Sequence, residues 1–593
     1  MSKRLISLIL VLVLFTTALI SCKKEPEGEI TETDTEVQTE APPPFYEIAA
    51  EELANYMIVY SADASQDVID ATTNLAAAFS MKFGVALRAR DDAYIDSTGN
   101  PVVGEYEILI GNTNRPESQQ FLSELEYQDR GYKVIGKKIV IAAHDPFITA
   151  NTVNEFSSFV RKTGKDVTVF FNTDMDHVVR GSYTFDTITV NGGDISDYQI
   201  VYPKGKSFER ALANKLRRVI AEQCGSMLTV TADNAEPTER EILIGKTNRA
   251  ANTAPLAGVN DGRGYLALDG NKLVLCGNTA LGNATATDAL IDLLTDGGSS
   301  DVLELHVENG LKTDANGASE FSAMTFNVGA DGINAGRKQR VVETIVRYLP
   351  DTIGLQECSA EWKKYLTEQL GDYYEYVGVG RDADGTGLAS AILYAKEKLT
   401  LKESATKWLS ATPDEVSKLD QADANYTYTW AKLERKDGES FILLNTQLGT
   451  NSVVRTAQAR MLLEFMWANK DTAIVLTGDL NCTEGSEEMN TLLCEFMRHS
   501  AVIAEEKQLG SQSANKLSDT VLVYDKFIDV TVMKVAADRI DGMYASKSNA
   551  AYIEFLVDYN GTEYTESGIT SNGQLNTVPD RDGEEYDPFI PFT

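Results

Sequence analysis

The chain has 593 residues, 43% of them hydrophobic, which is enough for about three or four domains at the usual ~150 residues each. It carries 88 acidic against 54 basic residues, and its formal net charge is −34. Such a surface repels polyphosphates, so the charge argues against sustained binding to bulk DNA or RNA and favours an exposed protein that stays in solution.

The N-terminus has the pattern of a secretory targeting segment. Lys3 and Arg4 precede a hydrophobic run, LISLILVLVLFTTALI, which is shorter than the ~18–20 residues of a membrane helix. The run leads into Leu19-Ile20-Ser21-Cys22, which resembles the bacterial lipobox, in which the cysteine is lipidated and becomes the mature N-terminus. We therefore expect residues 1–22 to be a lipoprotein signal peptide. Lipid on Cys22 would anchor the protein at the extracellular face of the cell membrane without a spanning helix. An ordinary secretory signal is the alternative.

Residues 23–44, KKEPEGEITETDTEVQTEAPPP, show no apolar periodicity and are rich in Glu, Thr and Pro. A segment of this composition buries too little apolar surface to fold, so we predict a disordered, extended tether. It would hold the globular part of the protein away from the lipid surface.

Three sequence blocks then occur twice, in the same order, which indicates a duplicated domain. The pairs are Tyr56–Tyr60 with Tyr198–Tyr202, Glu107–Arg115 with Glu241–Arg249, and Arg130–Tyr132 plus Lys138–Ile141 with Arg263–Tyr265 plus Lys272–Leu275. We predict one copy at residues 45–189 and the other at residues 190–315.

Each copy has the same succession of expected elements. A short strand comes first, followed by an amphipathic helix that ends in Gly, a strand, a hairpin around Gly-Tyr and a closing helix. This order predicts a small α/β sandwich with one helical face. The repeated blocks resemble the small α/β accessory domain of bacterial β-hexosaminidases and α-glucuronidases. That resemblance implies a structural or docking role, with a cell-surface glycan as one expected partner, and no chemistry.

Five cysteines follow the lipobox, and none has CxxC or Cys/His spacing. We expect them to be mostly buried small hydrophobic residues and not zinc ligands. A disulfide between some pair is allowed outside the cell, but no pairing can be deduced. They are Cys224, Cys276, Cys358, Cys482 and Cys494.

From about residue 318 the pattern changes to alternating strands and helices, and several strands end in polar residues that are not turn formers. Val341, Val342, Ile345 and Val346 fall on one face of a helix predicted at 336–348. A second helix is predicted at 455–467. The expected strands are 321–328, 351–357, 388–394, 429–433, 441–445 and 473–481.

The polar strand ends suit a metal-assisted reaction of a phosphoester. Glu357 offers a hard oxygen ligand of the kind that Mg²⁺ prefers, beside water and substrate phosphate. Asn327 and Asn481 offer carbonyl ligands or amide donors, and Asp479 can hold a water or add a metal contact. A bound cation of this kind neutralises phosphate charge and lowers the pKa of its water. Each strand end alone is better explained as a backbone cap, but the whole series in this order favours the site.

The series closely resembles the endonuclease/exonuclease/phosphatase superfamily over about residues 318–593. This resemblance implies a four-layered α/β sandwich, assigned to residues 316–593, and so the fold class α/β for the chain. Family members are metal-dependent phosphodiesterases and phosphomonoesterases that act on nucleic acids, phosphoinositides or sphingomyelin. The motifs that carry it are Phe326-Asn327, Leu355-Gln356-Glu357, Trp430-Ala431, Asn445-Thr446, Gly478-Asp479-Leu480-Asn481 and Arg539-Ile540-Asp541.

The resemblance also implies a role for each matching residue. Glu357 would be the ligand of Mg²⁺ or Mn²⁺, with Asn327 beside it in the metal shell. Asp479 would orient or deprotonate the attacking water, and Asn481 would hold Asp479 or the phosphate. Asp541 matches the carboxylate that partners the last family His. Because that His is absent here, Asp541 would lean toward the cation.

Two family histidines are replaced in this sequence. The family's Asn-Thr-His becomes Asn445-Thr446-Gln447, and the family's final Ser-Asp-His aligns with Tyr586-Asp587-Pro588, which keeps Asp587 and loses the imidazole. A Gln amide donates a hydrogen bond but stays neutral, so it cannot replace the charge-assisted bond of an imidazolium. We expect a site that binds a cation with weakened hydrolysis. The alternative is that Gln447, Tyr586 or Lys526 takes over the phosphate contact.

Two functions therefore stand as hypotheses. The first is a lipid-anchored, metal-dependent phosphoesterase whose partner is a small phosphoester or a lipid headgroup. The second is a non-catalytic surface module that binds glycan or a protein partner through its repeated domains.

Overall fold

The structure is a computed structural model of the chain. It describes residues 45–493, except 96, 297, 299–300, 314–320, 331–332 and 483–485, and short strands between residues 497 and 586. The predicted lipidation residue Cys22, the predicted tether at 23–44, and the site candidates Asp541 and Asp587 lie outside the described residues. In the part of the chain that is described, no helix has the length and apolar character needed to cross a membrane.

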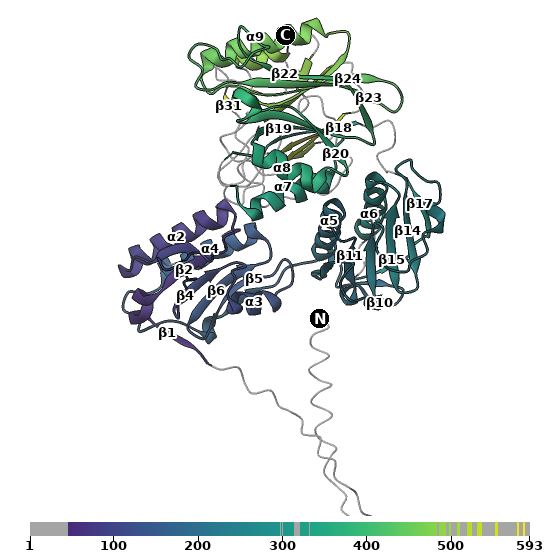
Figure 1. Cartoon of the computed structure of the whole chain (residues 1–593). Coiled ribbons are helices and arrows are strands. Elements are labelled where there is room, and N and C mark those ends of the chain that lie inside the picture. The colour runs from purple at the N-terminus through teal and green to yellow at the C-terminus, as the bar shows by residue number, and fades with distance from the viewer. Residues whose placement is uncertain are drawn as a thin grey trace, which may run out of the picture. The chain divides into compact units, whose positions relative to one another are not determined.

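The first α/β unit is built on a six-stranded sheet with the order β3-β2-β4-β6-β5-β8 (Figure 1). Helices α2 and α4 pack on one face of the sheet, against Ile58, Ile108 and Ile139. The short helix α3 packs on the opposite face through Phe121 and Leu122, so helices cover both faces and not only the one expected. The elements are β1 (Glu47–Ala49), β2 (Met57–Tyr60), α2 (Gln66–Phe83), β3 (Arg88–Asp91), β4 (Glu107–Ile110), α3 (Pro116–Ser123), β5 (Arg130–Ile135), β6 (Lys138–Ala143), α4 (Pro146–Lys162), β7 (Val169–Asn172) and β8 (His177–Val179).

The second α/β unit repeats this topology. Its six-stranded sheet has the order β12-β11-β13-β15-β14-β17, which places corresponding strands in the same succession as in the first sheet. The first long helix of each unit ends at a glycine with left-handed backbone, Gly84 at φ 70° and Gly225 at φ 81°. The elements are β9 (Thr187–Val190), β10 (Gly193–Asp194), β11 (Gln199–Tyr202), α5 (Ser207–Cys224), β12 (Val230–Ala232), β13 (Glu241–Ile244), β14 (Gly264–Asp269), β15 (Lys272–Gly277), α6 (Ala280–Thr295), β16 (Val302–Leu305) and β17 (Gly310–Lys312).

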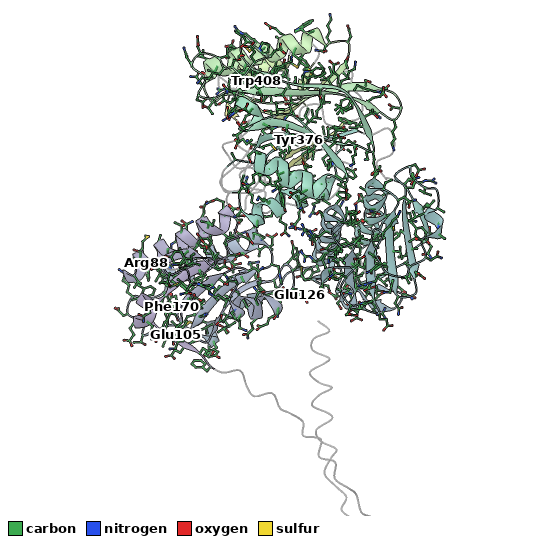
Figure 2. The ribbon with its side chains drawn as sticks, in the orientation of Figure 1. Arg88, Glu105, Glu126, Phe170, Tyr376 and Trp408 are labelled. Atoms are coloured by element: carbon green, nitrogen blue, oxygen red, sulfur yellow. The ribbon has the colours of Figure 1, made fainter. Side chains whose placement is uncertain are left out.

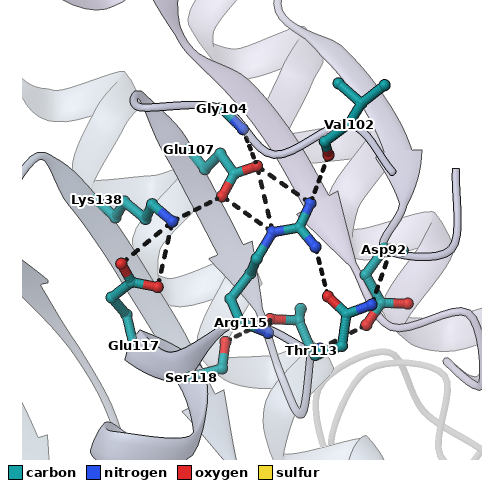
Figure 3. A network of polar contacts seen from close by, with 10 residues as sticks. Asp92, Val102, Gly104, Glu107, Thr113, Arg115, Glu117, Ser118 and Lys138 are labelled. Atoms are coloured by element: carbon teal, nitrogen blue, oxygen red, sulfur yellow. Dashed lines mark hydrogen bonds and ion pairs between the residues drawn. The ribbon is translucent and has the colours of Figure 1, made fainter. Parts of the chain in front are cut away.

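The repeated Glu-Ile-Leu-Ile-Gly-x-Thr-Asn-Arg block encodes a buried ion pair in each unit. In the first unit the Glu107 carboxylate, which is fully buried, accepts hydrogen bonds from Arg115 Nε at 3.2 Å and from the Gly104 N–H at 2.8 Å (Figure 3). Lys138 Nζ lies 3.1 Å from the same carboxylate. The second unit repeats the arrangement with Glu241, Arg249 and Lys272. A buried carboxylate needs such partners, so these residues recur for a structural reason.

This network keeps Glu107 ionised. Burial acts to raise the pKa of Glu107, but the hydrogen bonds from Arg115, Gly104 and Lys138 outweigh it and hold the pKa below its ordinary value. The folded pKa is therefore lower than the unfolded one. The stabilisation by ionised Glu107 is present above the ordinary value of 4.5 and is lost as the pH falls through the folded pKa.

Removing the guanidinium tests the network. We expect Arg115→Met to lower the free energy of unfolding by about 3–5 kcal/mol at neutral pH, because it leaves a buried carboxylate without its main partner. The matched control is Arg88→Met on the exposed start of β3 (Figure 2), which should stay within about 0.5 kcal/mol. Calorimetric unfolding of both variants measures the difference. Equal losses for the two would contradict the structural role.

The C-terminal domain consists of two packed sheets with helices outside them, the four-layered α/β sandwich that was predicted (Figure 1). The sheet orders are β20-β21-β19-β18-β29-β30-β27 and β22-β23-β24-β25-β28-β26. Apolar side chains such as Phe321, Ile392, Phe441 and Leu443 fill the space between the sheets. Helices α7 and α8 cover the outer face of the first sheet, and α9 and α10 cover that of the second.

The strands and helices of this domain have the following bounds. They are β18 (Phe321–Asn327), α7 (Ala335–Tyr348), β19 (Thr352–Cys358), α8 (Ala360–Leu370), β20 (Tyr374–Val377), β21 (Ala389–Ala395), β22 (Leu399–Trp408), β23 (Thr427–Arg435), β24 (Ser440–Gln447), α9 (Ser452–Ala468), β25 (Ala473–Asp479), α10 (Glu487–Leu493), β26 (Met497–His499), β27 (Lys507–Leu509), β28 (Asp519–Tyr524), β29 (Val530–Val535), β30 (Tyr552–Phe555), β31 (Val578–Pro579) and β32 (Glu585–Tyr586).

Capping residues start the helices close to the strand ends. Ser359 directly follows β19, and its side chain accepts a hydrogen bond from the Trp362 N–H to begin α8. Asn451 accepts from the N–H groups of Val453 and Val454 to begin α9, four residues after β24. Such caps stabilise a helix start by about 1 kcal/mol each. They also fix where the chain leaves each strand, and so where the last side chain of the strand lies.

Candidate active site

Four of the predicted site residues lie together at the ends of four strands. Asn327 ends β18 and Glu357 is the penultimate residue of β19, and these two strands are parallel neighbours in one sheet. Gln447 ends β24 and Asp479 ends β25, and these two residues are paired in the other sheet. The site therefore draws two residues from each sheet, at one end of the sandwich.

Two amide groups link the two carboxylates. Asn327 Nδ2 donates to Glu357 Oε1 at 3.1 Å and to Asp479 Oδ2 at 3.0 Å. Gln447 Nε2 donates to the same two oxygens, at 3.0 and 3.3 Å. Two negatively charged oxygens from different sheets thus share the same pair of N–H donors. The amides supply the positive partial charge that holds these carboxylates next to each other.

Glu357 reaches this position because β19 is irregular at its end. The pairing of β19 with β21 shifts register between Leu355 and Cys358, and Glu357 has a left-handed backbone with φ 55°. A residue other than glycine in this region costs about 1–3 kcal/mol, and such strain is concentrated at functional sites. The bulge re-aims the Glu357 side chain, whose Oε2 accepts a hydrogen bond from the Ala330 N–H at 3.0 Å.

Asn481 holds Asp479 through its backbone. Its N–H donates to Asp479 Oδ1 at 3.2 Å, whereas its side-chain Nδ2 donates to the Leu448 carbonyl at 2.7 Å. Asn481 also has a left-handed backbone, with φ 49°. The side chain therefore ties the end of β25 to the end of β24, next to Gln447.

Sequence reasoning missed the supporting role of Gln356 and Asn445, which lie between the two sheets. Asn445 Nδ2 donates to the carbonyls of Leu355 and Ala391 at 2.8 Å each, and Gln356 Nε2 donates to Asn445 Oδ1 at 2.6 Å. Gly354 allows the close approach, because a Cβ there would lie 2.0 Å from Thr477 Oγ1. These contacts fix the spacing of the sheets beside the site. Both residues belong to the family-like motifs at the strand ends. The only sequence signal of their supporting role is an amide side chain within a buried strand.

The donor set fits a divalent cation that prefers oxygen. Among the described residues, no group of three or more His, Cys, Asp and Glu is placed to hold a metal ion. Glu357 and Asp479 are two carboxylates with adjacent oxygens, and Mg²⁺ commonly takes only one or two carboxylates and fills its remaining positions with water and phosphate. Asn327 Oδ1 accepts from the Gly329 N–H at 3.0 Å, which presents Nδ2 to the carboxylates. A direct metal bond from Asn327 therefore stays a prediction.

The cysteines beside the site are packed and not reactive. Cys358 and Cys482 directly follow Glu357 and Asn481, and both are buried with free thiols, as are Cys224 and Cys276. Burial raises the pKa of Cys358 to about 12, so its thiol stays protonated. The predicted packing role is confirmed for these four residues.

The comparison with protein families agrees with the C-terminal pattern. Residues 324–548 match the model of the Endonuclease/Exonuclease/phosphatase family. These residues form a domain of that family. The family consists of phosphoesterase-type hydrolases, which generally depend on divalent metal ions, and the match indicates a domain of this type. No match was found among curated proteins.

Several solved structures are similar to part of the chain. The mannosyl-6-phosphatase of Bacteroides thetaiotaomicron is 25% identical and covers 34% of this chain and 85% of its own, with a TM-score of 0.32. An endonuclease/exonuclease/phosphatase of Bacteroides vulgatus is 26% identical, covers 34% of this chain and 85% of its own, and also has a TM-score of 0.32. The human Nocturnin catalytic domain with bound sulfate is 17% identical, covers 32% of this chain and 73% of its own, and has a TM-score of 0.27. These scores are too low to carry a substrate from any of the three to this chain.

Proposed function

We propose that the endonuclease/exonuclease/phosphatase domain hydrolyses a phosphoester with Mg²⁺ or Mn²⁺ held by Glu357, beside Asp479. The observation that carries this proposal is the pair of carboxylates from two sheets that share the amides of Asn327 and Gln447. The substrate class is a small phosphoester or a lipid headgroup, because the net charge of −34 disfavours bulk nucleic acid.

The residues divide the work between binding and proton transfer. Glu357 would hold the cation, which when bound neutralises phosphate charge and lowers the pKa of its water. Asp479 would accept the proton of the attacking water, and the Asn481 N–H keeps one Asp479 oxygen engaged while the other faces the amides. Gln447 would donate a neutral hydrogen bond to phosphate. Asp541, expected to lean toward the cation, and Asp587, the residue kept from the family's last motif, lie outside the described residues and stay predictions.

The proposed reaction is slower than that of a site with its full set of imidazoles. A positioned acid or base group contributes about 10²–10⁴-fold to a rate, and two such groups are replaced here, at Gln447 and Pro588. The site keeps its carboxylates and loses groups that carry a proton near neutral pH. We therefore expect the site to bind the cation and phosphate but to hydrolyse its substrate slowly.

Hydrolysis of bis(p-nitrophenyl) phosphate by the full chain tests the proposal. We expect slow release of p-nitrophenol with Mg²⁺ or Mn²⁺, its loss on addition of EDTA, and its return when excess metal is restored. Release that is unaffected by EDTA, or absent with both metals, would contradict a metal-dependent phosphoesterase.

We also propose that the protein is a lipoprotein, anchored through Cys22 at the extracellular face of the cell membrane. The lipobox-like sequence supports this, and fatty-acid labelling that persists in a Cys22→Ser variant would exclude it.

The repeated sheet topology supports a second candidate function, in which the two α/β units bind a cell-surface glycan or a protein partner and the C-terminal domain is a scaffold. Saturable glycan binding by a protein without phosphoesterase activity would favour this second function.

A further inference from the structure

A single arginine, Arg381, lies in the loop between β20 and β21 of the C-terminal domain. The Arg381 N–H donates to the Leu388 carbonyl at 3.1 Å, and the Arg381 carbonyl accepts from Trp408 Nε1 at 2.8 Å. Figure 2 labels Trp408 in the C-terminal domain. A Cβ on Gly387 would lie 2.2 Å from Asp382 Oδ2, which shows how tightly the loop closes on itself. The backbone of Arg381 is therefore fixed by contacts on both sides.

The guanidinium of Arg381 has no acidic partner among the described residues. Its Nε is buried and makes no hydrogen bond there. The adjacent carboxylate of Asp382 accepts instead from Asn425 Nδ2, at 3.1 Å. The Arg381 Cζ lies 5.8 Å from the centre of the Tyr426 ring, at a distance typical of a cation–π contact. In the described part of the chain, this partly buried cation therefore faces an aromatic ring and not a carboxylate.

Tyr426 connects this cation to the site. A Cβ on Gly449 would lie 3.3 Å from Tyr426 Cε2, so the ring packs against the segment that directly follows Gln447. Within that segment, the Leu448 N–H donates to the Asp479 carbonyl at 2.9 Å, and its carbonyl accepts from Asn481.

The electrostatic interactions of Tyr426 also connect Arg381 with Asp479. Burial, followed by the hydrogen bond to Asp423, raises the pKa of Tyr426 to about 12. The positive charge of Arg381 lowers this pKa and the negative charge of Asp479 raises it, so both charges act on one ring. Arg381 and Asp479 thus both lie close enough to Tyr426 for their charges to act on its hydroxyl.

We propose that Arg381 binds the phosphate group of the substrate and supplies the positive charge that is missing at Gln447. This inference rests on the proposed phosphoesterase function. A guanidinium presents a planar fork of N–H donors that matches two phosphate oxygens and carries a positive charge. The neutral amide of Gln447 cannot do this. Phosphate binding would therefore depend on a permanent cation in place of a titrating imidazole.

Binding of inorganic phosphate to the Mg²⁺-loaded full chain, measured by calorimetry, tests this assignment. We expect Arg381→Gln to weaken phosphate binding by about 10-fold or more and to raise KM more than it lowers kcat. Arg381→Lys, which keeps the charge but not the fork, should recover part of the affinity. The matched control is Arg460→Gln, which removes the same charge from an exposed pair with Glu487 on the same domain and should leave binding unchanged.

The outcomes separate this inference from the proposed function. Equal phosphate affinity in the wild type, Arg381→Gln and Arg460→Gln would overturn the inference, even if phosphoester hydrolysis is observed. Phosphate binding that is lost in Arg381→Gln but unaccompanied by hydrolysis would sustain the inference and overturn the proposed function. If Arg381→Gln does not fold, as judged by circular dichroism, Arg381→Lys decides: unchanged KM and phosphate affinity would count against the bidentate contact.

Discussion

Replacing Glu357 with glutamine is expected to lower kcat/KM for phosphodiester hydrolysis by more than ~100-fold. Loss of residues that only support metal ligands already costs about 10–100-fold in affinity or activity, and Glu357 is the proposed ligand itself. We also expect saturating Mg²⁺ to raise the melting temperature of the wild type, because a ligand that binds only the folded state stabilises it, and Glu357→Gln to abolish this rise. Steady-state kinetics and calorimetry measure the two effects.

The control for this prediction is Glu361→Gln. Glu361 lies four residues further along, in the first turn of α8, where it is largely exposed and pairs with Lys338. The variant makes the same change of charge in the same domain without touching the site. Wild-type kinetics and a wild-type response to Mg²⁺ in Glu357→Gln, beside an unchanged control, would contradict the assignment of Glu357.

Restoring an imidazole at position 447 is expected to raise the rate. We predict that Gln447→His increases kcat by on the order of 10²-fold, the lower end of what a positioned acid or base contributes. It should also introduce a pH dependence near 6.5, the ordinary pKa of histidine, that the wild type lacks. Rates measured between pH 5 and 8 show both effects, and Pro588→His can be added to test the second missing imidazole.

Gln447→Leu separates the loss of a donor from the gain of an imidazole. Leucine has a similar size but cannot bridge Glu357 and Asp479, so this variant should be slower than the wild type. An unchanged rate in Gln447→His, together with an unchanged rate in Gln447→Leu, would show that position 447 does not face the reacting phosphate.

The predicted helix at 336–348 shows which features of the fold were visible in the sequence. The structure places α7 at Ala335–Tyr348, because Val341, Val342, Ile345 and Val346 form one buried face and Pro350 follows the helix end. The strand ends were visible for a similar reason, since a buried apolar run stops where polar residues begin. Asn327, Glu357 and Asp479 were named from this pattern, and Gln447 was named from the family resemblance.

Backbone geometry and distant neighbours were not visible in the sequence. Nothing in the sequence marks the left-handed backbone of Glu357, because the surrounding structure imposes it. At Asn481 the residue type is only a weak signal, since Asn enters this region more often than most residues other than glycine. The side chain of Asn481 bonds to Leu448 and leaves Asp479 to the backbone, a detail that depends on the spacing of two strands. Arg381 lies nearly a hundred residues before Asp479, and no periodicity connects them; their common neighbour Tyr426 appears only in the fold.

The most direct measurement of the central claim is the anomalous diffraction of a crystal soaked in Mn²⁺. We expect one strong peak between Glu357 and Asp479, within ~2.0–2.3 Å of a Glu357 carboxylate oxygen, with the amides of Asn327 and Gln447 displaced from their present bridging bonds or turned toward bound water. Carboxylates that still share both amides, with no manganese near them at saturating metal, would contradict the claim that this is a cation site.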